Sequence, residues 1–482
     1  MINFRIIARI FSLLLIFEGL FMLISAGVSY YYKEPAMVSF IYSAVISIVT
    51  GVIVFTPLRN EERIYSNKEG YIIITGIWLI FSLFGTLPFL LSGSITSFED
   101  AFFESMSGFT TTGATILSSV ESMPFGIIFW RSLTQWLGGI AVIFISLSAL
   151  PGLKSLNIQL ANSEFSGQTS DKIHPRIKEA AKRLIIIYII LTIIEVILLA
   201  LAGLSLFDAV CHSFSTLSTG GFSTNSEGIA RYSSPYVKVI ITIFMFIAGT
   251  NMATIYFGLK GNFKKVIGNG EFVFYFILCI LFILISYFAL CIGNGFPSGK
   301  ALMEGSFNVV SIITTTGYYT GDYNLWSNSM IMILFLLMFT GGTSGSTSGG
   351  IKIIRLILIT KNSSQELKRL IHPSGYLPVR HNRHTVPQTT IFNLLVFITI
   401  YFIFLCFGAL IISFMDYDII TSFSTSASML ANIGPGIGSF GPFSDYSALP
   451  GAGKFFLSGL MLLGRLEFFA VMILFTKSFY KH

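Results

Sequence analysis

Threonine and glycine residues at four places in the chain could bind an alkali cation through their backbone oxygens. Three of these stretches read Thr-Thr-Thr-Gly, Ser-Thr-Gly-Gly and Thr-Thr-Thr-Gly, and the fourth, Ala-Asn-Ile-Gly, matches most loosely. They end at Gly113, Gly221, Gly317 and Gly434. Glycine permits the left-handed dihedrals that let successive carbonyls turn to one side. Rings of such carbonyls can replace the hydration shell of an alkali cation, as in potassium filters.

The four stretches align without gaps over a longer segment. A serine stands six residues before each of the four glycines. An acidic residue stands thirteen residues before the first three glycines, at Asp100, Asp208 and Glu304, whereas Thr421 holds that position in the fourth copy. Successive glycines are 108, 96 and 117 residues apart. A period of that length is a whole structural unit, so we predict four quasi-equivalent units.

A short amphipathic segment precedes each stretch. These segments are Asp100–Phe109, Phe207–Leu217, Ala301–Ile313 and Asp418–Leu430. Each is too short to span a bilayer, which takes ~20 residues of helix. A half-helix followed by non-helical backbone is tolerated at membrane depth only where it lines a cavity or is buried in protein. We therefore predict four half-helices around one pore; the alternative is a helix contact or reentrant turn that binds no ion.

Apolar runs flank these segments and predict an all-α polytopic membrane protein. Charged residues make up only 11% of the chain, against ~25% in soluble domains. We expect ten full spans: Ile6–Tyr30, Met37–Phe55, Ile72–Ser92, Phe125–Leu150, Leu184–Leu204, Tyr236–Leu259, Phe272–Ile292, Trp326–Ile359, Ile391–Phe414 and Phe455–Phe475. Residues 1–70 hold two N-terminal spans, and the pore units occupy residues 71–151, 183–260, 270–361 and 385–482.

The distribution of Lys and Arg predicts the orientation. Of the 30 basic residues, 21 lie at the two termini or in four loops on the same side of the predicted spans. Six lie near the opposite side: Lys33, Arg131, Arg231, Lys238, Lys300 and Lys454. By the positive-inside rule, both termini face the cytoplasm and the Thr/Gly stretches open to the outside. The net charge of +7 is therefore a topology signal, and the pattern argues against nucleic acid as a partner.

Motifs for catalysis are missing from the sequence. It contains no G-x-x-x-x-G-K-[ST] nucleotide-binding motif and no H-E-x-x-H metalloprotease motif. His381 and His384 form an H-x-x-H without partnering Cys or carboxylates, which is weak support for a metal site. We do not expect an enzyme.

The second span of unit three is interrupted by a glycine-rich decapeptide, Gly341–Gly350. Five glycines in ten residues destabilise a helix by ~1 kcal/mol each relative to alanine. Polar, non-helical backbone at membrane depth needs a protein- or water-lined environment. We expect a loop beneath the filter that could block the ion path; the alternative is a plain linker between two shorter helices.

Arg465 lies in the middle of the last apolar run. An ionisable residue there costs at least ~2.5 kcal/mol if it faces lipid, so it should face the pore or a partner. Glu467 is two positions further on and therefore on a different face of a helix. We expect Arg465 in the permeation path near the glycine-rich loop; the alternative is a structural bond to backbone carbonyls.

Taken together, these features resemble the Trk/Ktr/HKT superfamily: four joined helix–pore segment–helix units, one signature glycine per unit, the glycine-rich break and the arginine. The two additional N-terminal spans make the chain most similar to the bacterial Trk-type potassium uptake membrane subunits. The resemblance covers essentially the whole chain. It implies a fold related to simple potassium channels, a homodimer with one pore per protomer in the bacterial inner membrane, and a cytoplasmic nucleotide-binding RCK-type regulatory ring. It implies potassium as substrate and no cofactor in this chain.

The resemblance also assigns site residues by position. The filter residues would be Thr111, Thr112, Gly113, Gly220, Gly221, Thr315, Thr316, Gly317, Asn432, Ile433 and Gly434. Potassium would be held at Thr111, Thr112, Gly221, Thr315, Thr316 and Asn432. The gate would comprise Gly341, Gly342, Gly345, Gly349, Gly350 and Arg465. Unit four departs from the pattern, because Asn432-Ile433-Gly434 lacks the threonines of the other copies.

Two transport mechanisms fit these features. The first is a gated potassium uptake pathway driven by the membrane potential. The second is a secondary transporter that couples potassium to sodium or protons, which would use intramembrane carboxylates as relays. Glu195 and Glu467 are the main candidates for such a role.

Overall fold

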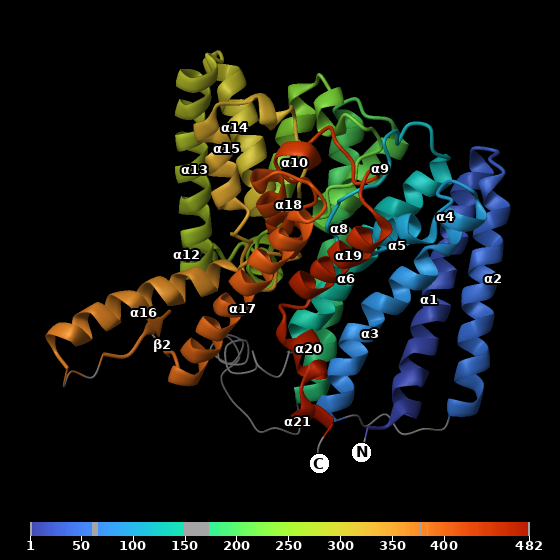
Figure 1. Ribbon diagram of the computed structural model, residues 1–482, viewed down its shortest axis with the longest axis horizontal. Coiled ribbons are helices and arrows are strands. Elements are labelled where there is room, and N and C mark those ends of the chain that lie inside the picture. The colour runs from blue at the N-terminus through green and yellow to red at the C-terminus, as the bar shows by residue number, and fades with distance from the viewer. Residues whose placement is uncertain are drawn as a thin grey trace.

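The computed structural model describes residues 2–59, 66–148, 173–373, 375, 377–382 and 384–480. These residues are mainly helical, which confirms the all-α prediction. Within them the strands are limited to a two-residue hairpin, β1 (Arg380–His381) and β2 (His384–Thr385). The N- and C-terminal ends lie at the same end of the molecule (Figure 1).

The first two helices form a pair at one edge of the molecule (Figure 1). They are α1 (Phe4–Tyr31) and α2 (Ala36–Phe55), and α1 also packs against the first and second spans of unit one. Two glycines allow the pair to approach closely. A Cβ added to Gly19 would lie 2.6 Å from Ile48 Cγ1, and one added to Gly51 would lie 2.7 Å from the Ser12 carbonyl oxygen. Close backbone approach at small residues is typical of helix packing in membranes.

Four units follow, each built as a first span, a pore helix and a second span. The first spans are α3 (Asn67–Gly85), α8 (Ile173–Leu201), α13 (Gly270–Asn294) and α17 (Gln388–Ser413). The pore helices are α5 (Phe98–Phe109), α9 (Leu206–Leu217), α14 (Ser298–Ile313) and α18 (Ile419–Ala431). The second spans begin with α6 (Phe125–Ser148), α10 (Pro235–Ala248), α15 (Asn328–Leu337) and α19 (Gly451–Arg465). Short connecting helices lie at α4 (Leu87–Leu91) and α12 (Phe263–Ile267), and the short helix α21 (Lys477–Tyr480) follows the last unit.

The pore helices begin and end where their sequences dictate. Ser97 and Ser205 accept hydrogen bonds from the backbone N–H groups of Asp100 and Asp208, and so cap α5 and α9. Asp418 caps α18 in the same way. The four helices contain 12 to 16 residues, so they extend only ~18–24 Å. Each stops inside the membrane region, with the negative end of its dipole toward the Thr/Gly stretch that follows.

Three of the four second spans are broken, two more than the sequence analysis predicts. Helix α10 meets α11 (Met252–Leu259) at 112°, and α19 meets the segment that starts with α20 (Phe469–Met472) at 111°. The third break is the glycine-rich loop between α15 and α16 (Ile353–Ile371). The sequence analysis gives no break within Tyr236–Leu259 or Phe455–Phe475, so it misses both bends. Among the described residues, seven unbroken helices are long and apolar enough to cross a membrane.

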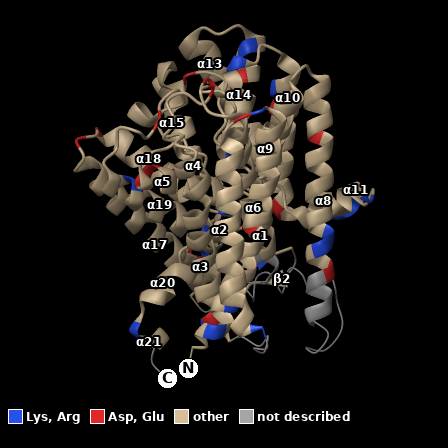
Figure 2. Ribbon diagram, turned by 90° about the vertical axis from the view of Figure 1, so that its right-hand side faces the viewer, with Lys and Arg blue, Asp and Glu red and all other residues tan. Residues whose placement is uncertain are grey.

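Charged residues lie mostly toward the ends of the helices, and uncharged residues make up most of their length (Figure 2). Three basic residues that the sequence analysis places opposite the termini are paired with carboxylates of pore helices. The pairs are Arg131 with Glu104, Lys238 with Glu304 and Lys454 with Asp100. The last two pairs join neighbouring units, because Lys238 and Lys454 belong to units two and four.

Candidate functional site

The four signature glycines lie around one axis in chain order. A Cβ added to any of them would fall within 1.8 to 2.6 Å of a carbonyl oxygen from the next unit. The neighbours are Gly113 with the oxygen of Gly220, Gly221 with that of Thr316, Gly317 with that of Ile433, and Gly434 with that of Thr112. Each of these oxygens belongs to the residue before a signature glycine. We call the four oxygens, those of Thr112, Gly220, Thr316 and Ile433, the carbonyl ring.

The backbone of each filter segment alternates between dihedral regions. The signature glycines have φ values of 81°, 76°, 78° and 102°. The residue two positions earlier is also left-handed in every unit, with φ of 50° to 56° at Thr111, Thr219, Thr315 and Asn432. Asn tolerates this region, but a β-branched threonine there is a genuine outlier. The surrounding structure therefore stores strain at three threonines, one of which, Thr219, was not among the predicted site residues.

Side-chain bonds brace the filter segments of units one, three and four. The hydroxyls of Thr110 and Thr112 lie 2.8 Å apart, as do those of the equivalent residues in unit three, Thr314 and Thr316. In unit four, Asn432 Nδ2 donates to Thr112 Oγ1 over 2.9 Å. The structure thus brings all the predicted filter residues together, including those of the divergent fourth copy.

A cavity of about 70 Å³ adjoins the ring on one side. Three signature glycines line it together with residues that follow them in the chain, among them Thr115, Ser223 and Tyr319.

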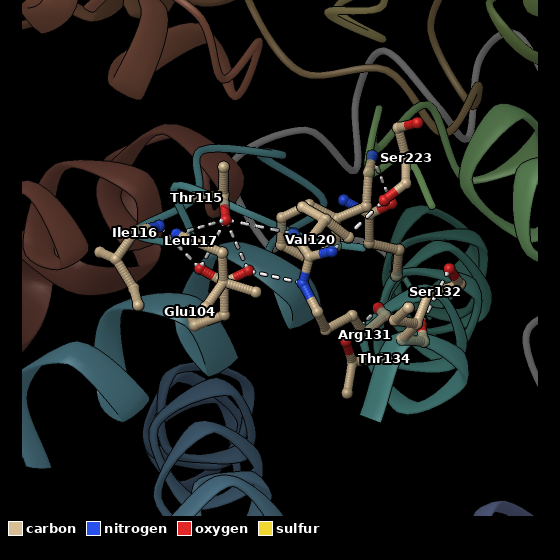
Figure 3. Close-up of polar contacts among 12 residues, drawn as sticks. Glu104, Thr115, Ile116, Leu117, Val120, Arg131, Ser132, Thr134 and Ser223 are labelled. Atoms are coloured by element: carbon tan, nitrogen blue, oxygen red, sulfur yellow. Dashed lines mark hydrogen bonds and ion pairs between the residues drawn. The ribbon is translucent and has the colours of Figure 1, made fainter. Parts of the chain in front are cut away.

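Glu104 and Arg131 form a buried ion pair behind the filter segments of units one and two (Figure 3). Arg131 Nε lies 2.7 Å from Glu104 Oε1, and the two side chains are 2% and 0% exposed. The carboxylate also accepts hydrogen bonds from Thr115 Oγ1 and the Ile116 N–H, at 3.0 and 2.9 Å. Arg131 donates to the Ser223 carbonyl over 3.3 Å. The pair therefore connects the backbone segments that follow two neighbouring filter segments.

Glu104 has a polar counterpart in every unit, nine residues before the signature glycine. The counterparts are His212, Asn308 and Thr425. His212 lies within 3.3 Å of the Tyr318 hydroxyl, and Asn308 Nδ2 donates to Thr320 Oγ1 over 3.0 Å. The sequence analysis missed this ring of buried polar residues, although the ungapped register that aligned the glycines contains it.

The loop Gly341–Gly350 packs against the other side of the carbonyl ring. Thr347 Oγ1 donates to the carbonyl of Leu217, the last residue of α9, over 3.0 Å. The Gly349 N–H donates to Thr315 Oγ1 over 2.7 Å, and a Cβ added to Gly349 would lie 2.2 Å from the Ala431 carbonyl oxygen. Leu217 and Ala431 end pore helices, and Thr315 precedes its signature glycine. The cavity is lined by signature glycines and by residues that follow them, so the loop and the cavity lie on opposite sides of the ring.

The predicted gate glycines leave no room for side chains. Gly345 and Gly350 have φ values of 75° and 65°. A Cβ added to Gly341 would lie 2.2 Å from the Gly349 carbonyl oxygen, and one added to Gly342 would lie 2.5 Å from that of Gly249. The loop is closed at its base, where the Gly341 N–H donates to the Ile351 carbonyl over 2.9 Å.

Two residues that the sequence analysis missed hold the loop from outside. Glu271, at the start of α13, accepts from the Ser344 N–H at 2.6 Å and from the Ile354 N–H at 3.2 Å. Asn251 Nδ2 donates to the Ser344 carbonyl. Asn251 lies at the break between α10 and α11, so this break faces the loop. Glu271 occupies the first turn of α13. Acidic residues are common there because they interact favourably with the helix dipole, so the sequence analysis did not single out Glu271 as a loop contact.

Charged side chains contact the second half of the loop and the start of α16. Arg465 Nη1 donates to the Thr347 carbonyl over 2.9 Å, and Lys352 Nζ donates to the Ser348 carbonyl. Glu467 pairs with Arg355, not with Arg465. The Arg355 guanidinium lies 3.8 Å from the centre of the Phe397 ring. Arg465 therefore contacts the predicted gate, and Glu467 already has a cationic partner.

The fold and the site define a class: a multi-pass membrane transport protein with four pore-helix units around a central ring of backbone carbonyls. A family model described as TrkH, cation transport protein, matches residues 35–269 and 270–481. The chain therefore belongs to the TrkH family of cation transport proteins, and it is not an enzyme.

Named relatives span the full length of the chain. The Trk system potassium uptake proteins TrkH of Salmonella typhimurium and of Escherichia coli K12 are each 34% identical over 99% of this chain and 100% of their own. TrkG of Escherichia coli K12 is 32% identical over 99% of each chain. The crystal structure of the potassium transporter TrkH from Vibrio parahaemolyticus superposes with a TM-score of 0.91 at 32% identity, covering 100% of both chains.

Proposed function

We propose that this chain takes up potassium through the carbonyl ring, driven by the membrane potential. The observation that carries the proposal is the close approach of each signature glycine to the carbonyl that precedes the next one. Four units thereby present four equivalent oxygens to one axis. The dipoles of four pore helices end at the same place and favour a cation there. The names of the relatives as potassium uptake proteins support potassium as the ion.

The loop Gly341–Gly350 and Arg465 form the gate of this pathway. The loop contacts the pore-helix ends of units two and four and the filter residue Thr315 of unit three, so it occupies the exit from the ring. Arg465 binds a loop carbonyl and adds a positive charge where a cation would have to pass. A cytoplasmic RCK-type regulatory subunit that displaces α16 would pull on the loop directly, because α16 follows it in the chain. The protein acts as a homodimer in the bacterial inner membrane, with both termini in the cytoplasm.

Coupled transport is a second candidate function, and one observation favours it. Glu195 in α8 and Glu18 in α1 are buried in membrane spans, and their carboxylate oxygens have no hydrogen-bond partner among the described residues. Such carboxylates are the groups that proton relays use in transporters. Glu467, the other carboxylate that the sequence analysis considered, is paired with Arg355.

Flux into proteoliposomes, with potassium and sodium gradients varied separately, tests the filter. Gly113→Ser, Gly221→Ser and Gly317→Ser should each lower the potassium-to-sodium permeability ratio, because the new Cβ displaces a ring carbonyl. Gly459→Ser is the matched control, since a Cβ at Gly459 has no neighbour within 4 Å. Unchanged ratios in all three filter variants would overturn the filter assignment.

The same vesicles separate the two mechanisms. A pH-sensitive dye inside them should report no proton movement that depends on the potassium gradient if the pathway is uncoupled. Proton uptake that follows potassium and disappears in Glu195→Gln, but not in the exposed-residue control Glu227→Gln, would favour the coupled transporter instead.

A further inference from the structure

One oxygen of the carbonyl ring is already hydrogen bonded by a side chain. Gln135, on α6 of unit one, is completely buried. Its Nε2 donates to the Gly220 carbonyl over 2.7 Å, and its Oε1 accepts from the Phe222 N–H over 3.1 Å. The side chain therefore holds the backbone on both sides of Gly221, the signature glycine of unit two. Among the described residues, Gly220 alone in the ring receives a side-chain hydrogen bond on its carbonyl oxygen.

The two partners leave the Gln135 amide only one orientation. A backbone carbonyl can only accept a hydrogen bond, and a backbone N–H can only donate one. The side-chain nitrogen must therefore face Gly220 and the side-chain oxygen must face Phe222. A residue without both a donor and an acceptor in this arrangement could hold only one side of the segment.

Unit two needs this support because its filter segment lacks a side chain that the others have. The equivalent of Gly220 is Thr112 in unit one and Thr316 in unit three. In both of those units the threonine hydroxyl is bonded to the hydroxyl two residues earlier, at 2.8 Å. In unit two Gly220 removes this internal brace, and the Ser218 hydroxyl keeps only the bonds to backbone carbonyls of its pore helix that Thr110 and Thr314 also make.

Gln135 occupies the space that the missing side chain leaves. A Cβ added to Gly220 would lie 2.4 Å from Gln135 Cδ and 2.6 Å from Oε1. Gln135 and a side chain at position 220 therefore exclude one another. The Gln135 side-chain amide, which belongs to the neighbouring unit, therefore takes the place of the threonine hydroxyl bond found in units one and three.

We propose that Gln135 is a positioning residue that sets ion selectivity by fixing the Gly220 carbonyl in the ring. Sodium is smaller than potassium and needs its oxygen ligands closer to the ion. A restrained carbonyl resists being drawn inward, and its lone pair is partly committed to the amide, so both effects disfavour sodium. The inference rests on the proposed function, because it requires that the ring conduct ions.

A double-mutant cycle between Gln135 and Gly220 tests the proposal. The single change Gln135→Ala should lower the potassium-to-sodium permeability ratio by roughly three- to tenfold, the scale of one hydrogen bond. Gly220→Thr alone should also be harmful, since its Cβ meets Gln135. The double variant Gln135→Ala/Gly220→Thr should recover most of the lost selectivity, because the introduced threonine hydroxyl can bond to Ser218 as Thr112 bonds to Thr110. A purely structural role for Gln135 does not predict that Gly220→Thr, which lowers selectivity alone, raises it in the Gln135→Ala background.

The full chain is measured in proteoliposomes, with size-exclusion profiles reporting folding. A ratio within twofold of the parent in Gln135→Ala, or a double variant no more selective than Gln135→Ala, would overturn the proposal. If Gln135→Ala does not fold but the double variant folds and is selective, the exchange of one brace for the other is supported; if neither folds, Gln135 is a structural residue and the proposal is wrong. Gly317→Ser, on the far filter segment, is measured in parallel. If Gly317→Ser lowers the potassium-to-sodium permeability ratio and Gln135→Ala does not, the filter assignment stands and only the role of Gln135 is wrong. If neither variant lowers the ratio, the filter assignment itself is wrong.

Discussion

Arg465 Nη1 donates a hydrogen bond to the carbonyl oxygen of Thr347 over 2.9 Å, and the other two guanidinium nitrogens have no partner among the described residues. The bond joins the second span of unit four to the middle of the loop that we propose as the gate. Arginine stays charged and offers a rigid fork of five donors. In the proposed gate, this one bond would hold the loop while the remaining charge repels a cation that arrives from the ring.

Removing either partner of this contact should open the pathway. Arg465→Ala, and separately a deletion within Gly342–Gly349, should raise potassium flux when no regulatory partner is present. The two changes combined should give less than the product of their separate effects, because both remove the same barrier. Flux of the reconstituted chain by itself measures this. If both variants insert and fold normally but conduct like the parent, the loop is a linker and Arg465 is structural.

Glu271 should stabilise the closed loop from the opposite side. Its Oε1 accepts from two backbone N–H groups, those of Ser344 and Ile354, which flank the loop's second half. Glu271→Ala removes both hydrogen bonds, each worth ~0.5–1.5 kcal/mol, so it should raise partner-free potassium flux several-fold. Glu271→Gln is the conservative control, because its Oε1 can accept the same two bonds, and it should fall between parent and Glu271→Ala. Equal flux in all three proteins would contradict a role for this carboxylate in gating.

The sequence predicted the repeated architecture because its signals are local and repeat. Apolar runs, short amphipathic segments and signature glycines each depend on a few neighbouring residues, and their ungapped register in four copies strengthened the prediction. The breaks in two second spans were not predicted, because hydropathy reports how apolar a segment is and not whether its helix axis changes direction. The bend after α19 passes through Glu467 and Phe468, which have φ values of 54° and 63°. Neither residue is a glycine, so nothing local indicates the turn.

The support around the filter could not be predicted because it comes from distant residues. Gln135 lies 85 positions from Gly220, and Glu271 lies 73 from Ser344. Each sits in an apolar run or at a helix start, where an isolated polar residue has several ordinary explanations. The absence of a threonine at position 220 was visible in the sequence. Which residue compensates for it became evident only from the packing of α6 against unit two.

The β1–β2 hairpin should weaken as the pH falls. Burial lowers the pKa of His381 from 6.5 to about 4, and the positive charge of Lys361 adds to this effect. Because the folded pKa lies below the unfolded one, the hairpin is favoured by neutral His381 above about pH 6.5 and loses this contribution as the pH falls toward 4. Amide hydrogen exchange in residues 379–382, corrected for intrinsic rates, should be faster at pH 5 than at pH 7.5. His381→Phe should remove the difference, and the same change at exposed His384 should not.

Cysteine labelling should establish the orientation. Ser364 on α16 and Ser233 before α10 are both exposed. If the majority of basic residues faces the cytoplasm, a cysteine at position 364 should react with an impermeant reagent only in opened cells or inverted vesicles. A cysteine at position 233 should react in intact cells. The reverse pattern would invert the protein and place the cavity beside the ring on the cytoplasmic side.

Breaking the Glu104–Arg131 pair should destabilise the protein more than removing both charges. The two side chains are 0% and 2% exposed, so Arg131→Met would leave a buried carboxylate with only two of its hydrogen-bond donors. Removing one partner of a buried pair typically costs ~3–5 kcal/mol, whereas replacing both is often nearly neutral. We therefore expect a clearly lower Tm for Arg131→Met in detergent, and partial recovery in Glu104→Gln/Arg131→Met. The exposed pair Arg183–Glu179, 3.7 Å apart and 60% and 72% exposed, is the matched control; Arg183→Met should change Tm little, because surface pairs contribute ~0–1 kcal/mol. A Tm for Arg131→Met equal to that of the control would show that the buried pair does not hold the two filter segments together.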